Sequence, residues 1–218
     1  MTGPDAPIRV LIVDDHEMMA ESLRRILDGD ESIDVVGVVG TGHGGVDAAG
    51  ALDPHVILMD YRLPDIDGVN ATARIKADRP ETQVVMLTGL DGDEQLALLA
   101  IEAGCCGFIS KTRPVAELLD AVRAASAGGT VISPVMLARL LPRLERDRRD
   151  IGFDLSKRER EVLDAMASGA SDKEIAAQLT ISWNTARKHV QNVMLKLGVH
   201  SKLEAVAVAM REGIVSPL

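Results

Sequence analysis

The sequence predicts an α/β domain built on a doubly wound, five-stranded parallel sheet, followed by a small all-α domain of four helices. Two observations lead to this prediction. Apolar segments of strand length alternate with helical patterns over the first 128 residues, and only helical patterns occur from residue 155 onward. The charges divide in the same way: residues 1–128 hold 10 Lys and Arg against 22 Asp and Glu, whereas residues 129–218 hold 14 against 11. An acidic front half and a mildly basic rear half favour two domains with different partners.

In the front half, the strands are predicted at 8–13, 35–39, 56–59, 84–87 and 107–109. The helices between and after them are predicted at 18–27, 46–52, 69–77, 94–103 and 115–127. The third strand, "VILM", has no polar alternation, which is typical of a strand buried on both faces of a parallel sheet. We therefore expect it at the centre of the sheet, with Asp60 at the carboxyl edge, where α/β sheets bind ligands.

Residues 129–154 are interpreted as a partly helical linker, in which Pro142 limits or kinks one helix. The helical domain, 155–218, is expected to contain helices at 157–168, 172–179, 183–197 and 202–212. The pattern S-x-x-E of the capping box begins three of them, and Ser182 can cap the fourth. The box serines are Ser156, Ser171 and Ser201, and the expected C-terminal glycines are Gly169, Gly198 and Gly213.

Composition narrows the class of protein. The chain has 218 residues, of which 26% are charged, and it lacks an apolar run of the ~20 residues that a membrane span needs. The N-terminal residues lack the basic and apolar regions of a signal peptide, so a cytoplasmic location is expected. Adjacent Cys105 and Cys106 suit neither a structural disulfide nor a metal site, and we expect both to be reduced and buried.

Polar residues follow four of the predicted strands. Asp14 and Asp15 follow the first strand, Asp60 the third, Thr88 the fourth and Lys111 the fifth. A single Asp after a strand is more often a turn or helix cap, but this combination is not expected from capping alone. Converging carboxylates repel one another unless a cation lies among them, and hard oxygen ligands suit Mg²⁺. The pattern predicts that Asp60 is a nucleophile between a metal and Lys111, acting on a phosphoryl group.

The predicted helix 183–197 has an apolar inner face and a polar outer face. The short preceding helix and the tight turn "TIS" make a helix-turn-helix. Arg, Lys and Gln are residue types that read the major groove of DNA, and we predict base contacts for Arg187, Lys188 and Gln191. Lys173, Thr185 and Lys196 suit contacts to DNA phosphates.

Both halves resemble known families. Residues ~7–128, with "VDDH", "MDYRLPDIDG", "LTG" and "GFISK", resemble a response-regulator receiver domain, which has a flavodoxin-like fold. The sequence from "LSKREREVLDAM" to "VHSKLEAVAVA" resembles a LuxR-type helix-turn-helix domain. Together they resemble a transcriptional regulator of the NarL/FixJ family. The rear half departs from the family pattern at Trp183, Ala186 and Leu195.

The resemblance implies a role for each site residue. Asp60 would be the phosphoacceptor, and Mg²⁺ would be held by Asp14, Asp15, Asp60 and the backbone carbonyl of Arg62. Lys111 would pair with the phosphoryl group, while Thr88 and Phe108 would form the switch. The implied partners are a sensor histidine kinase, double-stranded DNA and a second copy of the chain. No metabolic turnover is expected beyond self-phosphorylation.

Two other functions fit the sequence less well. An aspartate-nucleophile phosphatase of the haloacid-dehalogenase type needs a second Asp two residues after the nucleophile, and Arg62 stands there instead. A regulator that works without phosphorylation would have no use for the complete acidic cluster.

For the response regulator, phosphorylation is expected to promote dimerisation, with release of the rear domain from the front domain as the alternative.

Overall fold

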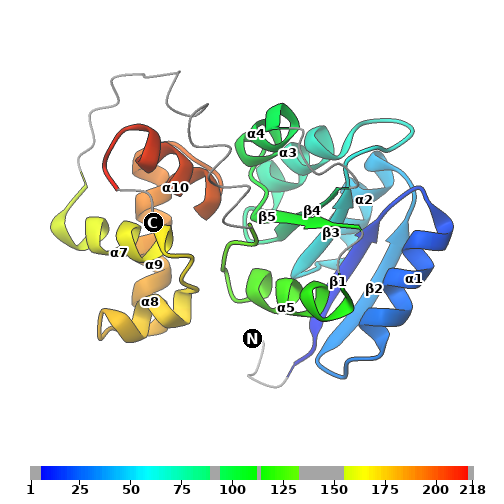
Figure 1. The fold of residues 1–218 in the computed structure, drawn as a ribbon, viewed down its shortest axis with the longest axis horizontal. Coiled ribbons are helices and arrows are strands. Elements are labelled where there is room, and N and C mark those ends of the chain that lie inside the picture. The colour runs from blue at the N-terminus through cyan, green and yellow to red at the C-terminus, as the bar shows by residue number, and fades with distance from the viewer. Residues whose placement is uncertain (1–5, 89–93, 112–113, 133–154, 216–218) are drawn as a thin grey trace.

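The computed structural model describes residues 6–88, 94–111, 114–132 and 155–215. The predicted helical part of the linker falls on 133–154 and lies outside the described residues. The front half forms the α/β domain, from β1 to α5, and the rear half forms the helical domain, from α7 to α10. Figure 1 shows the two domains side by side, with the sheet of the α/β domain between its helices.

The α/β domain contains a parallel sheet in the order β2-β1-β3-β4-β5, which confirms the predicted fold class and the central place of β3. The strands are β1 (Ile8–Val13), β2 (Ile33–Val39), β3 (Val56–Asp60), β4 (Gln83–Thr88) and β5 (Gly107–Ser110). Every residue of β3 is buried, because helices cover both faces of the sheet at its centre.

Five helices cover the sheet in two layers (Figure 1). They are α1 (Glu17–Asp28), α2 (Gly42–Leu52), α3 (Gly68–Asp78), α4 (Glu94–Glu102) and α5 (Val115–Ser126). Apolar side chains of α1 and α5 pack on one face, and those of α2, α3 and α4 pack on the other. The start of α2 lies four residues before the predicted start. There the chain reads "GHGG", which has no apolar periodicity, and the Thr41 side chain caps the helix instead.

The helical domain consists of α7 (Lys157–Ala167), α8 (Asp172–Gln178), α9 (Trp183–Leu197) and α10 (Lys202–Arg211). Two predicted capping boxes are formed, by Ser156 with Glu159 and by Ser171 with Glu174. The third is only half formed. The Ser201 side chain accepts a hydrogen bond from the Glu204 backbone, but the Glu204 carboxylate accepts one from the His200 backbone rather than from that of Ser201.

The predicted helix caps and the free, buried state of both cysteines are also confirmed. Ser182 caps α9, and Gly169, Gly198 and Gly213 all adopt the left-handed backbone conformation at helix ends. Cys105 and Cys106 are free and buried. Val131, in the segment predicted as linker, pairs with Gly107 of β5. Among the described residues, every helix is too short or too polar to cross a membrane.

The junction between β3 and α3 requires a glycine. A Cβ atom on Gly68 would lie 2.1 Å from the backbone oxygen of Asp60, whereas a Cβ atom on Gly50, inside α2, would meet nothing within 4 Å. The first residue of α3 therefore lies directly against the end of the strand that carries Asp60.

We predict that Gly68→Ala destabilises the α/β domain by about 1–3 kcal/mol, since backbone must shift to admit the methyl group. Gly50→Ala is the matched control, and we expect it to change stability by less than about 1 kcal/mol, in the stabilising direction. Urea unfolding followed by circular dichroism measures both. Equal effects of the two substitutions would contradict the close approach at Gly68.

Candidate functional site

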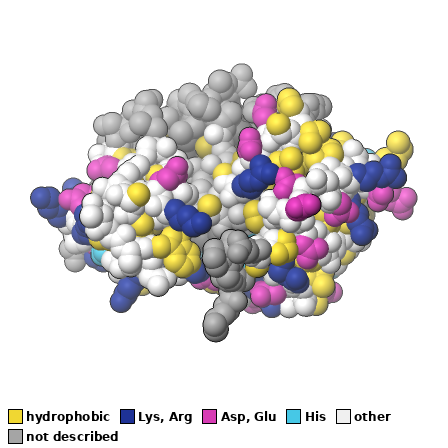
Figure 2. Space-filling model, turned by 90° about the horizontal axis from the view of Figure 1, so that it is seen from below, with side chains coloured by type: hydrophobic (Ala, Val, Ile, Leu, Met, Phe, Trp, Pro, Cys, Tyr) yellow, Lys and Arg dark blue, Asp and Glu magenta, His cyan; other side chains and the backbone are white. Residues whose placement is uncertain are grey.

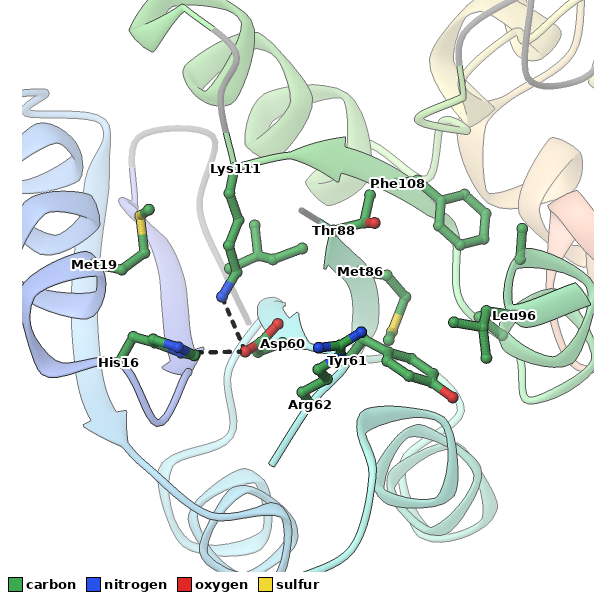
Figure 3. A pocket seen from close by; sticks show the side chains of 13 residues that line it. His16, Met19, Asp60, Tyr61, Arg62, Met86, Thr88, Leu96, Phe108 and Lys111 are labelled. Atoms are coloured by element: carbon green, nitrogen blue, oxygen red, sulfur yellow. Dashed lines mark ion pairs between the residues drawn. The ribbon is translucent and has the colours of Figure 1, made fainter. Parts of the chain in front are cut away.

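The carboxyl edge of the sheet brings together the acidic residues and the lysine that follow the strands. Asp14, at the end of β1, is 2% exposed, and Asp60, at the end of β3, is 4% exposed. The Lys111 ammonium lies 2.7 Å from Oδ2 of Asp14 and 2.9 Å from Oδ2 of Asp60. One cation thus bridges two nearly buried carboxylates. Figure 3 shows Lys111 extending toward Asp60 from the end of β5.

The charges of this group are unequal. Burial raises the pKa of the Asp60 carboxyl above its ordinary value, and the hydrogen bond from Lys111 offsets only part of that increase. Burial by itself lowers the pKa of Lys111, but the hydrogen bonds to Asp14 and Asp60 raise it overall. Lys111 is therefore held as a cation. The positive charge around Asp60 does not fully offset the cost of burying its carboxylate.

His16 belongs to the same cluster, although its position in the sequence predicted no role for it. Its Nδ1 atom lies 2.8 Å from Asp15, 3.3 Å from Asp14 and 3.9 Å from Asp60. Figure 3 shows it on the side of Asp60 away from Thr88. The only sequence signal was its place directly after the two aspartates.

The cluster fits a divalent cation. One ligand atom from each of Asp14, Asp15, His16 and Asp60 can be chosen so that all four lie within 4.8 Å of one another. Three of the four are carboxylates, the ligand type that Mg²⁺ prefers. A cation here would also supply the positive charge that Asp60 lacks.

The other two acids of the loop after β3 have structural roles. The Asp65 carboxylate accepts hydrogen bonds from the backbone N–H groups of Gly42 and His43, at 2.7 and 2.9 Å, and so caps the start of α2. These bonds, above all the one from His43, hold the pKa of Asp65 well below its usual range. Asp67 caps α3 through the backbone of Asn70 at 2.7 Å. Asp60 alone of these three acids joins the cluster.

A pocket of about 350 Å³ opens beside Asp60, between the ends of β3, β4 and β5 and helix α4. Thr88 and Phe108 line it together with apolar residues, among them Met86, Leu96 and Ala100. In Figure 3 Thr88 lies between Asp60 and Phe108. The two predicted switch residues thus border one cavity that reaches the predicted nucleophile. Arg62 also lines this pocket.

Helix α9 has the predicted two faces. Ala186, Val190, Val193 and Leu197 are buried in the core of the helical domain. Lys188 and Gln191 are at least partly exposed, and the Arg187 side chain is 39% exposed. The residues predicted to contact bases therefore lie on the outer face. At the three positions that depart from the family pattern, Ala186 is fully buried and Leu195 is 80% exposed. Trp183 is 44% exposed, and its ring lies under the Arg187 guanidinium.

The predicted phosphate-binding residues differ in their surroundings. Lys173 is exposed on α8. The Thr185 hydroxyl lies 2.7 Å from that of Ser182 at the start of α9. Lys196, in the last turn of α9, places its ammonium 2.8 Å from the carboxylate of Glu159, which also caps α7. In this structure Lys196 therefore ties α9 to α7.

The apolar side chains of α10 belong to two different cores. Val206 and Met210 pack inside the helical domain, whereas Leu203 and Ala207 pack with residues of the α/β domain, including Ala97 and Ile101 of α4. Figure 1 shows α10 and α4 on the facing sides of the two domains. One face of α10 is therefore covered in part by the chain's own α4.

Comparisons with known proteins match both domains. Residues 10–123 match the response regulator receiver domain, and residues 154–209 match the bacterial regulatory proteins of the luxR family. The chain is 36% identical over 208 residues to the response regulator protein VraR of Staphylococcus epidermidis, covering 95% of this chain and 99% of that protein. VraR of Staphylococcus aureus matches with the same identity and coverage.

Solved structures agree with this match. The response regulator ChrA of a heme-sensing two-component system is 31% identical, with a TM-score of 0.52, over 96% of this chain and 100% of that one. The response regulator RcsB of Salmonella typhimurium is 27% identical, with a TM-score of 0.55, over 92% of this chain and 96% of that one. A further structure, of two RcsB dimers bound to two parallel DNAs, is 26% identical with a TM-score of 0.55, over 94% of this chain and 98% of that one.

The Glu159–Lys196 pair generates a pH prediction. The hydrogen bond from Lys196, followed by that from Ser156, lowers the pKa of Glu159 from 4.5 to about 2. A folded-state pKa below the unfolded value stabilises the native state above the unfolded pKa. We therefore expect the helical domain to lose this stabilisation as the pH falls from about 4.5 to about 2.

Glu159→Gln should weaken that pH dependence and cost about 1 kcal/mol or less at neutral pH, because Lys196 is partly exposed. Urea unfolding at pH 7 and pH 3, followed by the emission of Trp183, measures both effects. Glu161→Gln, on the same helix, is the control. If the two variants have the same pH dependence, the Glu159–Lys196 pair does not stabilise the domain.

Proposed function

The chain belongs to the response regulators of two-component systems that join a receiver domain to a LuxR-type DNA-binding domain, and from this premise we propose that Asp60 accepts a phosphoryl group from a sensor histidine kinase. Members of this family are DNA-binding transcription regulators. In this chain the α/β domain is the receiver, and the helical domain is the DNA-binding domain.

The observation that carries the proposal is the position of Lys111 between Asp14 and Asp60, at 2.7 and 2.9 Å. An oxygen of Asp60 attacks phosphorus and forms the new P–O bond. The bond between phosphorus and the donor's nitrogen breaks, and the nitrogen keeps the electron pair. The Lys111 ammonium then offsets the negative charge of a phosphoryl oxygen rather than that of the carboxylate.

The acidic cluster would hold Mg²⁺ through Asp14, Asp15, Asp60 and the backbone carbonyl of Arg62. When bound, Mg²⁺ supplies positive charge that stabilises the transferring phosphoryl group. Asp14 also keeps Lys111 aligned, because its fully buried carboxylate lies 2.7 Å from the Lys111 ammonium. His16 lies over the carboxylates from the exposed side.

Thr88 and Phe108 would change conformation when Asp60 is phosphorylated. A phosphoryl group on Asp60 offers oxygens that can accept a hydrogen bond from the Thr88 hydroxyl. Movement of Thr88 changes the space available to Phe108, since both line one pocket. The surface formed by α4 and β5 would change with them and favour a homodimer. A solved structure of the similar protein RcsB contains two dimers bound to two parallel DNAs, which supports a dimeric form on DNA.

A metabolic phosphatase is not supported by the site. Arg62 occupies the position, two residues after Asp60, where that class of enzyme has a general acid. The family is one of transcription regulators, and we propose that self-phosphorylation at Asp60 is the only chemistry of the α/β domain.

We predict that the wild-type protein gains one phosphoryl group when incubated with Mg²⁺ and acetyl phosphate, and that Asp60→Asn gains none. Asp65→Asn, a neighbouring carboxylate with a capping role, is the control and should be phosphorylated like the wild type. Intact mass measurement reads the result. Phosphorylation of Asp60→Asn, or failure of Asp65→Asn alone, would contradict the assignment.

The same samples test the switch and the stability of the site. Sedimentation with and without acetyl phosphate should show a dimer only in the proteins that become phosphorylated, the wild type and Asp65→Asn, and not in Asp60→Asn. Because burial raises the pKa of Asp60, its ionisation opposes folding above that pKa. Asp60→Asn should therefore unfold at a urea concentration no lower than the wild type at neutral pH without Mg²⁺.

For DNA reading, we predict different effects of Arg187→Ala and Lys173→Ala. Loss of a base contact should cost about 1–3 kcal/mol on a preferred sequence and little on random DNA. Loss of a phosphate contact should weaken both alike and reduce the salt dependence. Titration of both variants on a duplex selected by the wild type and on a random duplex, at several salt concentrations, separates the two. Equal losses for Arg187→Ala on both duplexes would contradict base reading.

A further inference from the structure

The pocket beside Asp60 has an apolar part for which phosphoryl transfer has no need. This part is lined by Met86, Leu96, Ala97, Ala100 and Phe108. The whole pocket, about 350 Å³, is more than twice the size of an engineered apolar cavity of roughly 150 Å³ that binds benzene. It is therefore large enough for a molecule with two fused aromatic rings.

The walls of this part suit an aromatic molecule. In Figure 3 the Met86 side chain lies between the rings of Tyr61 and Phe108. Aromatic rings and a thioether sulfur both make favourable contacts with another aromatic ring, beyond the burial of apolar area. Ala97 and Ala100 of α4 are 2% and 1% exposed, and their small side chains leave the space open. A planar ring system fits these walls by size and by chemistry.

The charged side chains lie at the other end of the pocket. Asp60 is the one carboxylate among the described residues that line it, and the Lys111 ammonium lies 2.9 Å from its Oδ2 atom. Arg62 also lines the pocket and is exposed, but it forms no ion pair within the part of the chain that the structure describes. Figure 3 shows the Arg62 side chain between Asp60 and the Tyr61 ring. The pocket thus offers a cation to a ligand, whereas its carboxylate is already paired.

We propose that this pocket binds a small aromatic carboxylate, with its rings among the apolar walls and its carboxylate on the Arg62 guanidinium. A guanidinium can bind a carboxylate through two parallel hydrogen bonds. Mostly apolar walls with a few polar groups that fix orientation are typical of small-molecule sites. A cationic ligand would have to separate Asp60 from Lys111, and an uncharged ligand would leave Arg62 without an ion pair.

A bound ligand would also oppose the switch, and this second step rests on the proposed function. Thr88 and Phe108 line the same pocket, so a ring system in it holds Phe108 in the position described above. A ligand shifts a two-state element toward the state that it binds better. By reciprocity, phosphorylation of Asp60 would weaken binding of the ligand.

Calorimetric titration without Mg²⁺ tests the site, with 2-naphthoate and its uncharged analogue naphthalene-2-carboxamide as probes. An exposed ion pair is worth about 0.2–1 kcal/mol, so Arg62→Gln should weaken naphthoate binding about 1.5- to 5-fold and leave carboxamide binding nearly unchanged. Arg25→Gln is the control, because Arg25 is an exposed arginine on α1 that does not line the pocket. It should change neither affinity.

Two variants of α4 test the apolar walls. Ala100→Leu places a larger side chain in the pocket and should abolish binding of both probes. Leu96→Ala adds no atoms and should weaken both alike, by at least about 4-fold, which is the effect of one buried methylene group. Leu99→Ala, at an exposed position of the same helix, is the control, and circular dichroism checks that each variant is folded. Unchanged naphthoate binding in Leu96→Ala and Ala100→Leu, or no binding by the wild type at millimolar concentration, would overturn the proposal.

The effect on the switch is measured separately. With Mg²⁺ and acetyl phosphate, 2-naphthoate should slow the gain in mass of the wild type, and at the same concentration it should slow Leu96→Ala less. Equal rates with and without naphthoate in the wild type would refute the effect on the switch. The calorimetry uses no phosphodonor, so a failure of Asp60 to accept a phosphoryl group would refute the proposed function and leave the ligand site standing.

Discussion

The feature on which the rest of the structure depends is a strand that is buried on both faces and ends in a carboxylate. Neither face of β3 can offer water to Asp60, so the charge must be balanced by neighbouring strand ends. The sheet order places β1 beside β3 and β5 two strands away, and these supply Asp14 and Lys111. A glycine is needed at position 68 for a steric reason, because α3 begins against the backbone of Asp60 and a Cβ atom there would overlap its carbonyl oxygen.

The site separates acids that hold the fold from acids for which we propose a role in phosphoryl transfer. Asp65 and Asp67 accept hydrogen bonds from backbone N–H groups at helix starts. Asp14 and Asp60 are bridged by one lysine, although Asp14 also accepts a hydrogen bond from the backbone N–H of His16. The shared ammonium of Lys111, rather than residue type, distinguishes the two sets.

The helical domain uses one helix for two purposes. The inner face of α9 completes the core, and Lys196 at its end pairs with Glu159 on α7. The outer face presents Arg187 and Gln191, which in this arrangement meet Glu81 rather than solvent alone. On the face shown in Figure 2, most of the acidic side chains lie over the α/β domain, so its docking brings negative charge close to the helix that we expect to bind DNA.

The sequence alone determined the elements, the fold class and most of the proposed site. Periodicity, capping residues and terminal glycines act over a few residues, and strand ends in a parallel sheet meet at one edge. Asp14, Asp60, Thr88 and Lys111 could therefore be placed together from the order of the strands and the residues that follow them. The predicted bounds of the elements differ by at most two residues from those observed, except at the start of α2, where apolar periodicity is missing and capping decides.

Only the tertiary structure decided which side chains meet across long separations. The approach of His16 to Asp60, the capping of α2 by Asp65, the pair of Lys196 with Glu159 and the contact of Glu81 with Arg187 have no local pattern. The partner in each case is set by how two elements pack and by which rotamer fits between them. A polar side chain at a surface can pair with any of several charged or hydrogen-bonding groups. Its sequence neighbours do not specify which of these groups packing places beside it.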